Sequence, residues 1–205
     1  MRNLKNKTIF TNNPQIVLAS ASRTRQEMLK SYGIKFKVRH HTVNEEKLKK
    51  QLLGKRPEVI AMELSKAKAL SQVKQNRPKE LIIGSDQILL CEGKLMSKAK
   101  NREEAHRNFK LLNDRKHTLV SAIYIIQSKT EIWKKITNAS IFMKKMDDNT
   151  INQYLNDNMD TILKTVGGYK IENDDMNILQ VIKGKKEEIL GFPISDFVKL
   201  FEEYI

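Results

Sequence analysis

The chain has 205 residues, a hydrophobic content of 40% and a formal net charge of +14 at pH 7. This length suits one sizeable domain or two small lobes, and no apolar run approaches the ~20 residues of a membrane-spanning helix. The first 13 residues are polar and contain no apolar signal segment. We therefore expect a cytoplasmic protein with a flexible leader over residues 1–15 and a single domain over residues 16–205.

The excess of positive charge allows two interpretations. Lysine greatly outnumbers arginine and the basic residues spread along the whole chain, which favours a compositional bias over a dedicated nucleic-acid surface. An aromatic content of 6% supplies few platforms for stacking against single strands. A nucleic-acid partner is therefore the alternative rather than the expectation.

The first predicted strand, residues 16–19, leads directly into a helix over about residues 24–32. Ser20 and Ser22 lie in the turn between them, where a hydroxyl caps the start of a helix, and Arg25 adds positive charge near exposed backbone amides. This turn predicts a site of the size of a phosphate group. An ordinary serine-capped helix with surface arginines is the alternative.

A half-buried strand over residues 35–39 and a charged segment precede a long helix, which Pro57 opens and which is predicted to reach about residue 76. The apolar stripe of this helix places Lys66 and Lys68 on opposite flanks, each roughly 100° from its centre. Helical periodicity does not choose between the two lysines.

The next predicted strand, residues 81–86, is short and apolar and ends in Asp86. Active-site groups of α/β sheets gather where strands end, so this carboxylate is a candidate metal ligand or proton acceptor. An aspartate that caps its own turn is the alternative. Gln87 begins a further extended run, and Lys98 follows a predicted hairpin.

The second half of the chain continues the alternation of strands and helices. Helices are predicted over residues 101–112, 149–155 and 194–204, and strands over residues 118–127, 131–143 and 178–182. Two glycines at positions 167 and 168 precede an extended stretch that ends in Glu172.

An ordered set of motifs resembles the Maf family of nucleoside triphosphate pyrophosphatases. The motifs are Leu18-Ala-Ser-Ala-Ser-x-x-Arg25, Lys66-Ala, Gly84-Ser-Asp-Gln87, Lys98 and Gly191-Phe-Pro-Ile194. The resemblance implies an α/β, Maf/ITPase-like fold, in which a mixed twisted sheet with flanking helices surrounds a central nucleotide cleft. It also implies a homodimer, a divalent cation (Mg²⁺ or Mn²⁺), and hydrolysis of noncanonical or modified nucleoside triphosphates to monophosphate and pyrophosphate.

The resemblance also implies a role for each matching residue. By this resemblance, Asp86 is the proton acceptor that activates the attacking water. The family pattern is a lysine followed by an alanine, with a second alanine two residues after the first, and this pattern favours Lys66 over Lys68. The remaining roles are Lys66 and Lys98 as catalytic clamps on the phosphates, Ser20, Ser22 and Arg25 as phosphate ligands, Asp86 and Glu45 as metal ligands, and Thr24, Gln87 and Glu172 as determinants of base choice.

The residues at the positions associated with base choice resemble the class that acts on 7-methyl-GTP. A carboxylate only accepts hydrogen bonds, so Glu172 suits the N1 and amino donors of a guanine edge and opposes the carbonyls of uracil or thymine. We therefore expect a guanine-type base, with a pyrimidine (dTTP/UTP) pyrophosphatase and a non-catalytic basic RNA-binding protein as alternatives. A Glu172 side chain that faces solvent in its acidic neighbourhood would carry no base preference.

Overall fold

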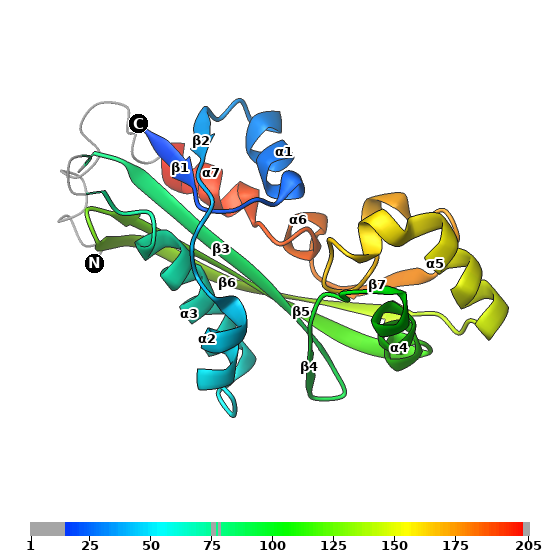
Figure 1. The fold of residues 1–205 in the computed structure, drawn as a ribbon. Helices are drawn as coiled ribbons and strands as arrows, with labels where there is room; N and C mark the ends of the chain where they lie inside the picture. Colours follow the sequence, from blue (N-terminus) through cyan, green and yellow to red (C-terminus); the bar gives the residue numbers. More distant parts are fainter. Residues whose placement is uncertain (1–14, 75–76, 78, 203–205) are drawn as a thin grey trace. The chain divides into compact units, whose positions relative to one another are not determined.

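The structure is a computed structural model that describes residues 15–74, 77 and 79–202, so the expected leader lies outside it except for residue 15. The elements are β1 (Ile16–Leu18), α1 (Arg23–Ser31), β2 (Phe36–Val38), α2 (Glu45–Gln51), α3 (Pro57–Leu70), β3 (Leu81–Cys91), β4 (Lys94–Met96), α4 (Arg102–Leu112), β5 (Arg115–Gln127), β6 (Thr130–Met143), α5 (Asp148–Ile162), η2 (Ile171–Asn173), β7 (Leu179–Lys183), α6 (Lys186–Ile189) and α7 (Ile194–Glu202) (Figure 1). None of these described helices is long and apolar enough to cross a membrane.

The strands of the described residues form one mixed sheet in the order β2-β1-β3-β5-β6-β7, with β4 paired to β3. Strand β1 runs parallel to both β2 and β3, whereas β4 and β7 pair antiparallel with their neighbours. The predicted mixed α/β sheet with helices around it is confirmed.

Three predicted boundaries change by five residues or more. Helix α3 ends at Leu70, not near residue 76. Helix α5 continues to Ile162 through a kink at Asn158, because Ile162 is buried in the core and extends the apolar face beyond Leu155. The strand expected to end at Asp86 continues to Cys91.

The chain divides into two compact units, each with its own core. The first comprises the described parts of residues 1–86, 121–137 and 190–205, and the second comprises residues 87–120 and 138–189. In the second unit, strand residues pack against α4 and α5, where the Phe109 and Tyr154 rings lie 5.0 Å apart between centroids.

In the first unit, apolar clusters lie on both faces of the strands. Leu18 and Ile83 share a cluster with residues of α1 and α7, while Val17 and Ile82 share another with Ala69 of α3. Successive strand residues point to opposite faces of a sheet. Burial on both faces explains why these strands are continuous apolar runs rather than alternating ones.

Gly84 allows α3 to lie directly on β3. A Cβ atom at this position would be 2.0 Å from the carbonyl oxygen of Ser65 and 2.8 Å from the backbone nitrogen of Ala69. The Ser65 side chain is fully buried, and its hydroxyl lies 2.8 Å from the carbonyl oxygen of Ala61 and 3.0 Å from that of Ala122. The glycine therefore brings one particular face of α3 against the strand that carries Asp86.

We expect Gly84→Ala to lower the free energy of unfolding by about 3 kcal/mol, because the new methyl group meets backbone atoms that cannot rotate away. Urea denaturation followed by the fluorescence of Trp133, the single tryptophan, measures the loss in the first unit. Gly33→Ala, in the same unit, is the control: it meets open space at a positive φ of +70° and is expected to cost only about 1 kcal/mol. Equal losses in the two variants would contradict a tight contact at Gly84.

Candidate active site

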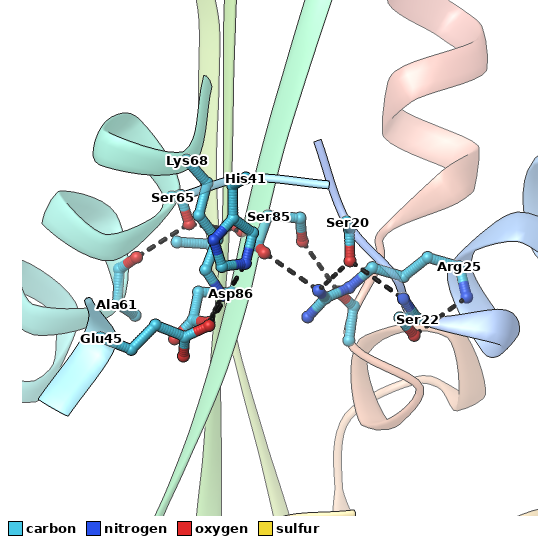
Figure 2. Close-up of polar contacts among 12 residues, drawn as sticks. Ser20, Ser22, Arg25, His41, Glu45, Ala61, Ser65, Lys68, Ser85 and Asp86 are labelled. Carbon is cyan, nitrogen blue, oxygen red and sulfur yellow. Dashed lines mark hydrogen bonds and ion pairs between the residues drawn. The ribbon is translucent and has the colours of Figure 1, made fainter. Parts of the chain in front are cut away.

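The turn between β1 and α1 is fixed by two serines. Ser22 caps α1 as predicted, and its Oγ accepts a hydrogen bond of 3.4 Å from the backbone N–H of Arg25. Ser20 is buried, and its Oγ accepts from the backbone N–H of Ser22 at 3.3 Å and from Arg25 Nη1 at 3.2 Å (Figure 2). Thr24, in the first turn of α1, is partly buried.

The guanidinium of Arg25 turns into the protein. The residue is only 8% exposed, and its donors contact the carbonyl oxygens of Ser85, at 2.9 Å from Nη1, and Gly191, at 3.3 Å from Nε. Burial lowers the pKa of Arg25, and the nearby Asp86 and Glu45 carboxylates oppose this effect. Arg25 is therefore not the surface arginine that a simple capped helix would carry.

A lysine bridges two carboxylates in the first unit. Lys68 Nζ donates to Asp86 Oδ1 at 2.5 Å and lies 2.9 Å from Glu45 Oε1, and both Lys68 and Asp86 are about 5% exposed (Figure 2). The Nε2 atom of His41 lies 3.3 Å from the same Glu45 oxygen. The hydrogen bond with His41 and the charge of Lys68 hold the pKa of Glu45 well below its usual range, although partial burial opposes them.

Local sequence explains how Glu45 comes to this place. Asn44 caps α2, because its side-chain oxygen accepts from the backbone N–H of Lys47 at 2.9 Å, so Glu45 is the first residue of the helix. A carboxylate in the first turn of a helix is favourable. Glu45, the residue that the family resemblance implies as a metal ligand, therefore lies at a helix start and shares Lys68 with Asp86.

The structure brings Lys68, and not Lys66, to Asp86. Lys66 is partly buried, and its Nζ lies 5.9 Å from the centroid of the Tyr124 ring. Two residues along an α-helix differ by roughly 200° in direction, so only one of the two lysines can face β3.

The buried face of α3 contains the signal that could have identified Lys68. The buried residues are Ile60, Ala61, Leu64, Ser65, Lys68 and Ala69. Their spacing is a regular helical stripe in which small residues form half of the packing surface. A stripe drawn only through large apolar side chains misses this half, and with it the lysine that lies on the buried face.

Asp86 has one oxygen without a partner. Within the part of the chain that the structure describes, its Oδ2 atom is buried and makes no hydrogen bond, while Oδ1 is held by Lys68. The pairing of β3 with β1 covers only Leu81–Ile83, so Asp86 lies past the end of β1. An oxygen of this kind can accept a proton or bind a cation.

The other predicted site residues belong to the second unit. The Nε2 atom of Gln87 donates to the carbonyl oxygens of Ile189 and Glu188, at 2.9 and 3.4 Å. Lys98 is exposed after β4, and Glu172 is exposed in the short helix η2.

The segment before Glu172 is anchored by a pair that sequence analysis did not identify. The Tyr169 hydroxyl lies 2.5 Å from His117 Nε2 in the core of the second unit. Burial lowers the pKa of His117 to about 4 and raises that of Tyr169, so both rings are neutral at pH 7. Gly168 has a φ of +72°, and a Cβ atom there would lie 2.7 Å from the Phe109 ring.

Comparisons with known proteins give consistent matches over nearly the whole chain. A family model described as Maf-like protein matches residues 15–204. The nucleoside triphosphate pyrophosphatase of Pelagibacter ubique is 33% identical over 93% of this chain and 96% of that protein. The 7-methyl-GTP pyrophosphatase of Bartonella henselae is 34% identical over 87% of this chain and 90% of that protein. The dTTP/UTP pyrophosphatase of Fusobacterium nucleatum is 32% identical over 90% of this chain and 92% of that protein.

Proposed function

This chain belongs to the family of Maf-like proteins and is a nucleoside triphosphate pyrophosphatase, and we propose that it acts on a guanine-type base, as in 7-methyl-GTP, with Asp86 as its proton acceptor. The observation that carries the assignment of the site is the bridge from Lys68 to Asp86 and Glu45. A buried carboxylate with a fixed partner on one oxygen and none on the other has the arrangement that a general base requires.

We propose the following reaction at this site, as the family resemblance implies. Asp86 takes a proton from a water molecule through Oδ2, while the water oxygen forms a bond to the α-phosphorus. The bond from this phosphorus to the bridging oxygen breaks, and pyrophosphate leaves with a nucleoside monophosphate remaining. Lys68 holds the Asp86 side chain in place through the hydrogen bond to Oδ1, a role distinct from the phosphate clamp that the resemblance implies for Lys66.

The acidic pair also fits a divalent cation. The Asp86 and Glu45 carboxylates share Lys68 as a partner, and these two side chains would hold the cation. Carboxylate oxygens are the ligands that Mg²⁺ and Mn²⁺ prefer. No group of three or more candidate side-chain ligands occurs in the described residues, so the protein would supply at most these two carboxylates to a cation. When bound there, a divalent cation would supply positive charge against the substrate phosphates.

The phosphate groups are assigned to the start of α1 and to Lys98. Backbone N–H groups in the first turn of a helix favour anions, and the Ser20 and Ser22 hydroxyls hold this turn in shape. Lys98, an exposed residue of the second unit, keeps in this proposal the phosphate-binding role that the resemblance implies.

Base choice is assigned to Thr24, Gln87 and Glu172. A relative named 7-methyl-GTP pyrophosphatase supports the guanine assignment, whereas the relative named dTTP/UTP pyrophosphatase favours a pyrimidine as the second candidate. Glu172 is exposed, which is the arrangement expected if its carboxylate carries no base preference. The guanine assignment is therefore supported by the residue types at these three positions and by the relative named 7-methyl-GTP pyrophosphatase.

We expect the wild-type protein with Mg²⁺ or Mn²⁺ to release pyrophosphate faster from 7-methyl-GTP than from GTP, dTTP, UTP or CTP. Glu172→Gln should reduce the preference for 7-methyl-GTP over UTP roughly tenfold, because the amide replaces an acceptor by a donor at the base edge. Pyrophosphate release measured over this panel gives the ratio of kcat/KM values. Asp175→Asn, in the same acidic stretch, is the control and should leave the ratio unchanged.

A preference for UTP or dTTP in the wild type would replace the guanine assignment by the pyrimidine one. Turnover of none of the five nucleotides would favour the RNA-binding alternative. RNA affinity that falls steeply with salt would then support that alternative.

A further inference from the structure

We propose that Arg25 is a positioning residue that fixes the peptide group in front of Asp86, and that it does not act as a ligand of the substrate phosphates. Its kinetic consequence rests on the proposed function, whereas its structural consequence does not. The proposal replaces the phosphate-binding role that sequence resemblance implies for Arg25.

The first argument is the direction of the side chain. Arg25 starts from α1, but its guanidinium contacts three groups from separate parts of the first unit. Figure 2 shows it between Ser20, which follows β1, and Ser85 on β3; it donates to the Ser20 hydroxyl and to the Ser85 carbonyl oxygen. The third acceptor is the carbonyl oxygen of Gly191, before α7. The distances are 3.2, 2.9 and 3.3 Å. Together these bonds engage the Nε and Nη1 donors with protein acceptors.

The second argument is what the acceptors hold. The Ser85 carbonyl belongs to the peptide group that joins Ser85 to Asp86, so the bond from Arg25 orients the backbone from which the Asp86 side chain starts. Ser85 is fully buried, and its hydroxyl donates to the same Gly191 carbonyl at 3.3 Å. Gly191 has a φ of +84°, a conformation that favours glycine. Arg25 and Ser85 therefore tie the turn at Gly191 to β3.

The third argument is the requirement for arginine. A guanidinium presents several donors in a rigid planar fork, whereas a lysine ammonium is a compact charge on a flexible stem. A phosphate ligand needs mainly the charge, but a residue that joins three acceptors in different directions needs the fork. Arg25→Lys separates these roles, and Arg23→Lys, an exposed residue of the same helix, is the matched control.

The test combines hydrogen exchange of the free protein with steady-state kinetics. For Arg25→Lys we expect amide exchange to rise about tenfold in peptides that cover residues 81–86 and 190–194, because lost bonds make local opening easier. With 7-methyl-GTP, kcat should fall at least about tenfold and KM should change less than about threefold, because Asp86 is misplaced while phosphate binding is kept. Arg23→Lys should change neither measurement.

Unchanged exchange in Arg25→Lys, or a KM that rises at least about tenfold with kcat retained, would overturn the proposal and restore a phosphate-binding role. If the wild type hydrolyses no triphosphate, the proposed function fails, but the exchange experiment still decides the role of Arg25. If Arg25→Lys does not fold, Ser20→Ala removes one of the three acceptors. It should raise exchange in the same peptides, and unchanged exchange there overturns the proposal.

Discussion

Asp86→Asn is expected to slow pyrophosphate release roughly 10³-fold, the largest effect of any substitution considered. An amide cannot take the proton of the attacking water, so the step that Asp86 performs through its unpartnered Oδ2 is lost. The amide has nearly the same shape as the carboxylate, and its oxygen can still accept the hydrogen bond from Lys68 Nζ. The fold should therefore persist while the activity disappears.

Initial rates with 7-methyl-GTP and Mg²⁺, together with a thermal unfolding curve, separate these two effects. Asp160→Asn removes an almost fully exposed carboxylate on α5, and it should retain wild-type rates. Activity of Asp86→Asn within about threefold of wild type would remove Asp86 from the proton-accepting role.

Lys68→Met should reduce both activity and stability, whereas Lys66→Met should change neither by much. Without Lys68, the buried Asp86 carboxylate loses the partner that neutralises it, which costs about 3 kcal/mol of unfolding free energy for a buried pair. We expect the rate of pyrophosphate release to fall roughly 10²-fold, because the Asp86 carboxylate is then no longer held in place.

Lys66→Met is the matched control for this pair. Both lysines lie on α3 and both are replaced by methionine. Among the interactions described above, Lys66 makes only the cation–π contact with the Tyr124 ring, and a contact of this kind contributes about 1 kcal/mol. Urea denaturation and the same pyrophosphate assay measure both variants. A larger loss of activity in Lys66→Met than in Lys68→Met would return the catalytic assignment to Lys66.

Most of the fold could be predicted from local pattern, because the signals involved are contained in short stretches. The apolar run at residues 16–18, the cap at Ser22 and the proline at the start of α3 each specify a structure through their own neighbours. Boundaries were less accurate. Helix α5 passes through the kink at Asn158 because burial of its last turn compensates for the break.

The site depended on contacts that no local pattern contains. The acceptors of the Arg25 guanidinium at Ser85 and Gly191 lie 60 and 166 positions away in the sequence. Both acceptors are backbone carbonyl groups, which every residue type carries, so no residue type marks them.

By itself, therefore, the sequence determined the mixed α/β architecture, the family and the candidate carboxylate at Asp86. Only the tertiary structure decided that Lys68 rather than Lys66 meets Asp86, and that Arg25 turns inward. Helical periodicity gives the angle between two side chains but not the neighbour that each one faces. Here that neighbour was selected by the close approach of α3 to β3 at Gly84, which places the small residues of the helix, and Lys68 with them, against the strand.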